Sequence, residues 1–139
     1  MSTLLFDQKD RVGAWVAQQV GQDTGWGDFY ALGVEMGGEV VAGVVFNNYN
    51  AVNATAHIAI AKPCKAAREM IRHACRYAFV ECGLKRLTGM VPVSEPKTIA
   101  FDQHLGFEPE FIMESAAFDG GDLQVLVMWP DKCRWLRRN

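Results

Sequence analysis

The stretch NATAHIAIAKPCKAAREMIRHACRYA, residues 53–78, changes its pattern at Pro63. Before the proline, the residues predict a strand over 53–61. After it, apolar side chains return every three or four positions, which predicts an amphipathic helix that Gly83 ends. The apolar face consists of Ala67, Met70, Ile71, Ala74 and Ala78. If this helix is a right-handed crossover, the next strand lies parallel to the strand before it.

The residues before this stretch predict a helix and a β-hairpin. Asp7 can cap the helix, and Gly21 can end it. Gly37 and Gly38 are typical of a tight turn between two strands. The predicted elements are a helix over 8–20, a glycine-rich loop over 21–27, and strands over 29–36 and 40–46.

The residues after the stretch predict a strand, a second helix and a strand pair. Ser94 is placed to cap this helix, Pro96 falls in its first turn, and Gly106 closes it. The predicted strands are 86–93, 107–118 and 123–129, and a short basic end follows over 131–139. This order predicts an α+β fold with a mixed, mainly antiparallel central sheet and flanking helices.

Length and charge limit the kind of protein. With 139 residues and 50% apolar content, the chain is expected to form one domain over residues 1–139. The 14 basic and 16 acidic residues nearly cancel, so neither a nucleic acid nor a membrane is expected as a partner. No apolar run is long enough to span a membrane, and the first residues do not resemble a signal peptide, which predicts a cytoplasmic protein.

Four cysteines occur without a C-x-x-C pair, so we expect reduced thiols. A zinc site from Cys64, His73 and Cys82 would spread its ligands over more than about 20 Å of one helix. No metal site is therefore predicted.

The turn between the central strand and its helix is the first candidate site. Helix N-termini present free N–H groups and a partial positive charge, which suit a pyrophosphate. Lys62, Lys65 and Arg68 add charge there, and Ala66 and Ala67 are small enough for an anion to approach. The alternative is an ordinary strand-to-helix turn with solvated lysines.

The chain over about residues 29–129 resembles the GNAT (GCN5-related N-acetyltransferase) superfamily. The most specific match is IAFDQHLGF, residues 99–107, which is similar to the family's helix ending in Leu-Gly-Phe. The chain also has a remote similarity to small acetyltransferases of phage and prophage origin. The chain departs from the family in three places: the phosphate turn has no glycine, Asp102 stands where a tyrosine acid is common, and Glu95 stands where an asparagine is common.

The resemblance implies a transferase that moves an acetyl group from acetyl-CoA to an amine. It implies that main-chain groups of Ala59, Ile60 and Ala61 pair with the pantetheine arm. It also implies that the turn from Lys62, with amides from Lys65 to Arg68, holds the pyrophosphate, and that the second helix, with Phe101, flanks the thioester. The acceptor is a small molecule or a protein amine, and a homodimer stays open.

His57 is the best candidate for a general base, because its ordinary pKa of about 6.5 suits proton transfer near neutrality. The alternative is a packed core histidine. His104 lies near a helix C-terminus, where the helix dipole accounts for it. Asp102 would be ionised at pH 7 unless it is buried, and Cys64 or Cys75 as nucleophiles are weaker hypotheses.

The acceptor is expected between the glycine-rich loop and the hairpin after Phe118. The aromatic candidates are Trp26, Phe29 and Tyr30, and the acidic candidates are Asp28, Glu35, Asp119 and Asp122. The sheet is expected to splay between strands 53–61 and 86–93, so that the thioester can pass. A CoA-binding module without turnover and a structural domain are the alternatives to an active enzyme.

Overall fold

A seven-stranded mixed sheet with three α-helices makes up the computed structural model, which describes residues 1–137. The elements are β1 (Ser2–Leu5), α1 (Lys9–Val20), β2 (Phe29–Met36), β3 (Glu39–Asn47), β4 (Asn53–Ile60), α2 (Lys65–Arg76), β5 (Arg86–Pro92), α3 (Pro96–Leu105), β6 (Glu108–Met113) and β7 (Leu123–Met128). Their order in the sheet is β1-β2-β3-β4-β5-β7-β6, and only β4 and β5 pair in parallel. The α+β prediction and the parallel central pair are confirmed.

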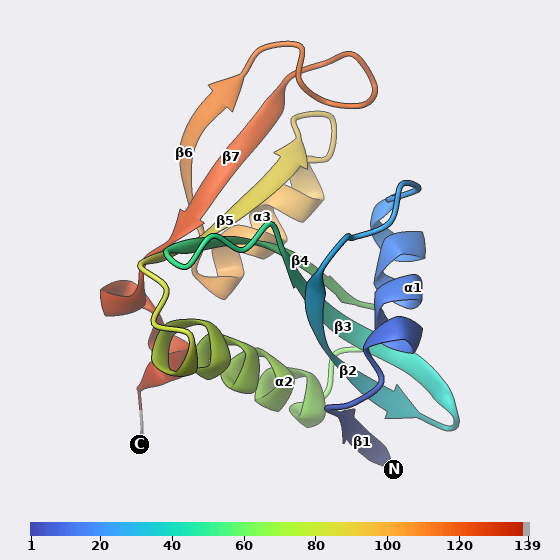
Figure 1. The fold of residues 1–139 in the computed structure, drawn as a ribbon. Coiled ribbons are helices and arrows are strands. Elements are labelled where there is room, and N and C mark those ends of the chain that lie inside the picture. Colours follow the sequence, from blue (N-terminus) through green and yellow to red (C-terminus); the bar gives the residue numbers. More distant parts are fainter. Residues whose placement is uncertain (138–139) are drawn as a thin grey trace.

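The sheet splays at its centre, as expected. β4 and β5 are paired only from Asn53 opposite Arg86 to Thr55 opposite Thr88. Beyond that point the strands run apart, and Figure 1 shows β2, β3 and β4 on one arm and β5, β7 and β6 on the other. The unpaired lengths of β4 and β5 border the opening.

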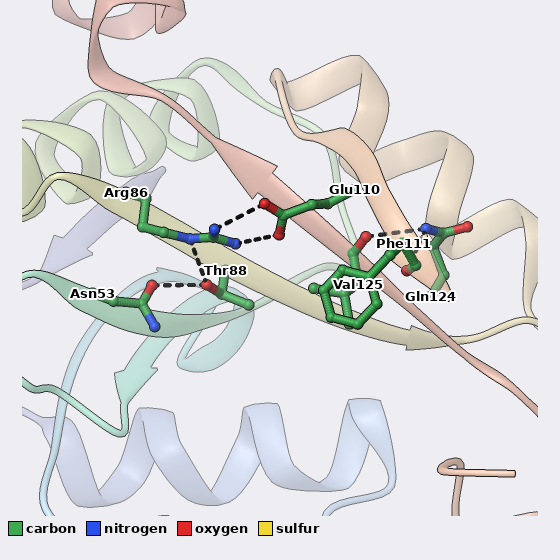
Figure 2. A network of polar contacts seen from close by, with 7 residues as sticks. All are labelled: Asn53, Arg86, Thr88, Glu110, Phe111, Gln124 and Val125. Carbon is green, nitrogen blue, oxygen red and sulfur yellow. Dashed lines mark hydrogen bonds and ion pairs between the residues drawn. The ribbon is translucent and has the colours of Figure 1, made fainter. Parts of the chain in front are cut away.

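A polar network joins the two arms where β4 and β5 still pair (Figure 2). The Thr88 hydroxyl donates to Asn53 Oδ1 at 2.7 Å and accepts a bond from Arg86 Nε at 3.2 Å. The other guanidinium nitrogens of Arg86 donate to both carboxylate oxygens of Glu110 on β6, at 3.0 and 2.7 Å. A bidentate pair of this kind is stronger and more directional than a single ion pair.

We predict that Arg86→Met lowers the free energy of unfolding by about 1 kcal/mol, because the guanidinium is only partly exposed and three hydrogen bonds are lost. The matched control is Lys132→Met, since Lys132 and Glu108 form a longer, 3.7 Å pair that is much more exposed. Urea denaturation of both variants measures the effect. Equal losses in the two variants would contradict the role of the network.

The two faces of the sheet carry separate cores. The larger core contains the apolar face of α2 together with side chains of β2 to β5 and β7. The smaller core lies under α1, where Val12 and Val16 are fully buried. Gly33 and Gly43 make this close approach of α1 possible, because a Cβ on either would lie within 2.6 Å of a valine methyl of the helix.

Several local predictions need correction. β1 was not predicted; it pairs with β2 at the edge of the sheet. The residue at the N-cap of α1 is Gln8 rather than Asp7, and that of α3 is Glu95 rather than Ser94, whose hydroxyl instead donates to Asp119 at 2.7 Å.

The last turns of three elements also differ from prediction. The helix after Pro63 ends at Glu81, two residues before Gly83, and its last turn, Tyr77–Glu81, is a π-turn. β6 ends at Met113 rather than at residue 118. The C-terminal segment forms two 3-10 turns, Pro130–Lys132 and Arg134–Leu136, and residues 138–139 of the predicted basic end lie outside the described residues.

Candidate functional site

A cavity of about 320 Å³ lies in the opening between β4 and β5, and we call it the central cleft. Its walls come from β4, β5, the C-terminal end of α1 and the first turns of α3. The lining residues are Gln19, Val20, Ala56, His57, Ile58, Ala59, Ile60, Met90, Val91, Pro92, Glu95, Lys97, Thr98, Phe101 and Asp102. The predicted residues His57, Ala59, Ile60 and Phe101 are thus brought together.

Along β4, only every second residue directs its main-chain N–H and C=O groups toward the cleft. The Ala61 N–H donates to the Val41 carbonyl at 2.8 Å, and the register places Ala59 opposite Gly43. Because hydrogen-bonded and non-bonded pairs alternate in an antiparallel ladder, Ala59 also bonds to β3. The main-chain groups of Ile58 and Ile60, and not those of Ala59 and Ala61, therefore face the opening.

The His57 side chain lies on the α1 face of β4, where it is held by residues of two other segments. Its Nε2 lies 2.9 Å from Asn47 Oδ1, and the Asn47 amide nitrogen donates to the Trp26 carbonyl at 3.3 Å. This network assigns the amide oxygen to the histidine, so Nε2 carries the proton and Nδ1 is the free base. The Trp26 ring packs at 4.5 Å from the imidazole.

Burial lowers the pKa of His57 from its ordinary 6.5 to about 4. Desolvation penalises the charged imidazolium, and the neutral amide of Asn47 does not compensate for it. His57 is therefore neutral at physiological pH, with an unprotonated nitrogen. The sequence left a packed core histidine as the alternative to a general base. The side chain is indeed packed, but it also lies in the wall of the central cleft.

Asp102 lines the same cleft from α3, and burial raises its pKa from 3.8 to about 7. The sequence analysis expected an ionised carboxylate unless the side chain is buried, and burial is the case here. The surroundings are apolar. A Cβ on Gly89 would lie 3.8 Å from Asp102 Oδ2 and 3.7 Å from the Phe107 ring. Near neutral pH, a substantial part of this carboxyl is protonated.

A second, larger cavity of about 810 Å³ opens on the α2 side of the sheet, and we call it the basic groove. It lies between the N-terminus of α2, the C-terminal half of α3 and the segment after β7. The lining residues are Ile60, Pro63, Cys64, Lys65, Ala67, Arg68, Ile71, Arg72, Phe101, His104, Leu105, Arg134 and Trp135. Among these described residues are four Lys or Arg side chains and no carboxylate, a composition suited to an anion.

The predicted phosphate turn forms one end of the basic groove. Cys64 is the N-cap of α2 and supplies no side-chain cap. The first N–H groups of a helix lack partners within the helix, so those of Lys65 and Ala66 stay available to a ligand. Ala67 is buried in the α2 core and Ala66 packs against it, so both methyl groups point toward the core. Lys62 is exposed and lines neither cavity.

Two residues of the groove were not expected from the sequence. Arg134 donates to the His104 carbonyl at 2.7 Å, and the Trp135 indole donates to the Leu105 carbonyl at 2.7 Å. These bonds fix the segment after β7 against the end of α3. Ile60 and Phe101 line both cavities, so the basic groove and the central cleft meet there.

Most predicted acceptor residues lie elsewhere. Trp26 is buried under α1, Tyr30 stacks on Tyr77 at 3.6 Å on the α2 side, and Phe29 does not line the cleft either. The acidic candidates have local partners or stay in solvent: Glu35 pairs with Arg11, Asp119 accepts from Ser94 and Gly121, Asp122 accepts from Ser115, and Asp28 is exposed. Beside His57, the central cleft is lined instead by residues such as Gln19, Val20, Glu95 and Lys97.

The four cysteines are unbridged. A hydrogen bond with Cys133, together with burial, raises the pKa of the Cys75 thiol, which argues against its role as a nucleophile. Within residues 1–137, no group of three or more His, Cys, Asp or Glu side chains could hold a metal ion. None of the helices described there has both the length and the apolar character needed to cross a membrane.

The chain has an α+β fold, and its splayed, mixed sheet matches that of GNAT-fold structures. A structure of a spermidine N-acetyltransferase SpeG mutant from Vibrio cholerae has 21% identity and a TM-score of 0.65, over 88% of this chain and 73% of that one. A chimera of that enzyme and hSSAT has 18% identity and a TM-score of 0.69, over 99% of both chains. The manganese complex of spermidine/spermine N-acetyltransferase SpeG has 17% identity and a TM-score of 0.68, over 94% of both.

These TM-scores establish a common fold. No protein-family profile matches the chain, and no curated protein is significantly similar to it in sequence. The predicted resemblance to phage and prophage acetyltransferases stays a prediction.

Proposed function

We propose that this protein transfers the acetyl group of acetyl-CoA to a primary amine. The observation that carries the proposal is the meeting of the basic groove with the central cleft at Ile60 and Phe101. An anionic coenzyme in the groove can thereby present a thioester to a second compartment that contains an unprotonated histidine. A plain structural domain would need neither cavity.

The groove suits a pyrophosphate in both charge and shape. Lys65, Arg68 and Arg134 supply positive charge around the open amides of α2. The lack of glycine in the turn is not an obstacle, because the methyl groups of Ala66 and Ala67 face the core rather than the amides. The main-chain groups of Ile58 and Ile60 would pair with the pantetheine arm along the unpaired edge of β4.

Acetyl-CoA, when bound, supplies an activated acyl group on sulfur. His57 Nδ1 would accept the proton that the attacking amine loses, while Asn47 holds the other ring nitrogen in its protonated form. The amine nitrogen must be neutral when it attacks, and a base that is itself neutral above about pH 4 is available for that proton.

The acceptor would enter the central cleft beside Gln19, Val20, Glu95 and Lys97. The side chains of Glu95 and Lys97 carry opposite charges there, so the negative end of the α1 dipole, with no basic residue in the last turn, is the feature that favours a cationic amine. The structural neighbours are spermidine N-acetyltransferases, so spermidine is the first acceptor to assay. A protein lysine remains the alternative acceptor.

Arg68→Glu tests the coenzyme site. We expect the wild-type protein to bind acetyl-CoA with micromolar affinity in calorimetric titration, and the charge reversal to weaken binding at least fivefold, about 1 kcal/mol, by placing a carboxylate beside phosphate. Arg76→Glu is the matched control, because Arg76 lies at the other end of α2 and lines neither cavity.

The outcomes separate the alternatives. Equal affinities in wild type and Arg68→Glu would move the coenzyme elsewhere. No binding to the wild type at millimolar acetyl-CoA would leave only a structural domain. Binding without release of free thiol, across a panel of amines that includes spermidine, would indicate a coenzyme-binding module without turnover.

A further inference from the structure

One face of the arm formed by β5, β7 and β6 has no helix against it among residues 1–137. α3 packs on the other face of this arm, where Leu126 and Met128 of β7 belong to the larger core. α1 packs on β2, β3 and β4 of the first arm (Figure 1). The side chains that alternate with Leu126 and Met128 therefore point to an open face.

The strand register gathers apolar side chains on this open face, because directly opposed residues share one side of a sheet. The first row consists of Met90, Val125 and Phe111, and the second of Pro92, Leu123 and Met113. Figure 2 shows Phe111 beside Val125. We call these six side chains the apolar shelf.

The apolar shelf is exposed to solvent. Phe111 is 52% exposed, and Met90 and Met113 are each 41% exposed. Val125, between Met90 and Phe111 in the first row, is buried but belongs to neither of the two cores. Exposed apolar side chains that are clustered in this way mark a binding surface, whereas scattered ones do not.

The apolar shelf continues the wall of the central cleft, since Met90 and Pro92 line that cleft. It also lies on the same side of the sheet as the proposed base. Thr55 of β4 pairs with Thr88 of β5, and His57 and Met90 follow two residues later on their strands. An amine beside His57 can thus extend its body across β5 to β7 and β6, over about 10 Å.

The charges around this path do not suit a polyamine. None of the six shelf residues is charged, Glu110 at one end is paired with Arg86, and Lys97 offsets Glu95 at the cleft. A polyamine carries a further ammonium group besides its reacting nitrogen, and such a group is costly to bury without a carboxylate. An alkyl or aromatic group gains free energy there by leaving water.

Within the acetyl transfer proposed above, on which this inference rests, we propose that the acceptor is a primary monoamine whose apolar alkyl or aromatic body lies on the apolar shelf. Its nitrogen forms the amide bond to the acetyl carbon and loses a proton to His57. The thioester C–S bond breaks with its electron pair on sulfur. The sulfur takes a proton from solvent while His57 returns one, so the products are an amide and a free thiol.

A matched pair of acceptors tests this class. Hexylamine and 1,6-diaminohexane have the same carbon chain and differ by the second amino group. In thiol-release assays with acetyl-CoA, we expect kcat/KM to be at least about tenfold higher for hexylamine. From butylamine to hexylamine, kcat/KM should rise about two- to fourfold for each added methylene.

Phe111→Asp and Ile112→Asp are matched variants that test the position of the acceptor. The two residues are neighbours on β6 and are both 52% exposed, but Ile112 lies opposite Gln124, on the other face. We expect Phe111→Asp to lower kcat/KM for hexylamine at least about fivefold and to raise it for 1,6-diaminohexane, with KM for acetyl-CoA within about twofold. Ile112→Asp should leave both amines unchanged.

Three results would overturn the proposal. The first is a wild-type preference for 1,6-diaminohexane, spermidine or a lysine peptide over hexylamine, and the second is an equal effect of the two variants. The third is a wild-type dimer in light scattering that Phe111→Asp converts into a monomer, because the shelf would then be an interface between two copies. Failure of the proposed function appears differently, as wild-type protein that releases no thiol with any of these amines.

Discussion

Replacing His57 by alanine is expected to lower kcat by about 10²-fold or more while the affinity for acetyl-CoA changes little, which is the usual pattern when a general base is lost. The imidazole lies in the central cleft and not in the basic groove, so the coenzyme contacts stay in place. Steady-state kinetics and calorimetry on the same preparation measure both quantities. His73→Ala is the matched control, because His73 lies on α2 against Phe6.

The same substitution has a pH signature. Because the pKa of His57 is lowered to about 4, the acidic limb of the wild-type profile should lie near pH 4 and not near 6.5. Below pH 6.5, His57 is protonated in the unfolded chain but stays neutral in the folded protein. The stability of the wild type should therefore decline as the pH falls from about 6.5 to 4, and that of His57→Ala should decline less. A variant with the acidic limb intact and only a lower Tm would show that His57 is a packing residue.

Gly43→Ala is expected to destabilise the protein by about 1–3 kcal/mol, the usual cost of inserting a methyl group into a filled core. The new Cβ would lie 2.5 Å from Val16 Cγ2 and 3.0 Å from Val12 Cγ1, and both valines are fully buried. α1 would have to move away from the sheet. Chemical denaturation followed by circular dichroism measures the change in the free energy of unfolding.

Gly89→Ala is the control for this comparison, since it is the same substitution in another strand of the sheet. Its Cβ would meet the Phe107 ring at 3.7 Å, which is an ordinary contact. Because glycine in a strand carries an entropic cost of roughly 0.5–1 kcal/mol relative to alanine, we expect no loss of stability and a small gain. A similar destabilisation in both variants would mean that the fit of α1 does not explain the effect at Gly43.

The spacing of apolar residues along the chain predicted most of the fold. Each helix and strand must turn apolar side chains toward one of the two cores, and this requirement produces the spacing. β2, β4 and the helix after Pro63 were placed within a residue or two of their observed ends. β1 escaped prediction because four residues with two leucines carry no pattern of their own, and their strand conformation depends on pairing with β2. The cap at Ser94 failed for a similar reason, since its hydroxyl is bonded to Asp119 of a distant loop.

The candidate site was predicted less completely, because its properties come from residues that are far apart in sequence. The position of His57 could be read from its strand, but its neutral state depends on burial among Asn47, Trp26 and α1. The protonation of Asp102 likewise depends on burial against β5, which no local pattern reveals. The sequence could not show which residues of β4 turn their main-chain groups toward the cleft. That depends on the pairing with β3, which the hydrogen bond from Ala61 to Val41 fixes.

The contribution of Arg134 and Trp135 to the basic groove bears on the order of events during folding. One wall of the groove comes from residues near 63 and another from residues near 135, so their approach closes a loop of about half the chain. Such non-local contacts form late, because the entropy of loop closure is lost before they return any stability. If the proposed coenzyme binds in the basic groove, we expect the strands and α2 to assemble without its help, because the groove is complete only after the segment beyond β7 has docked on α3.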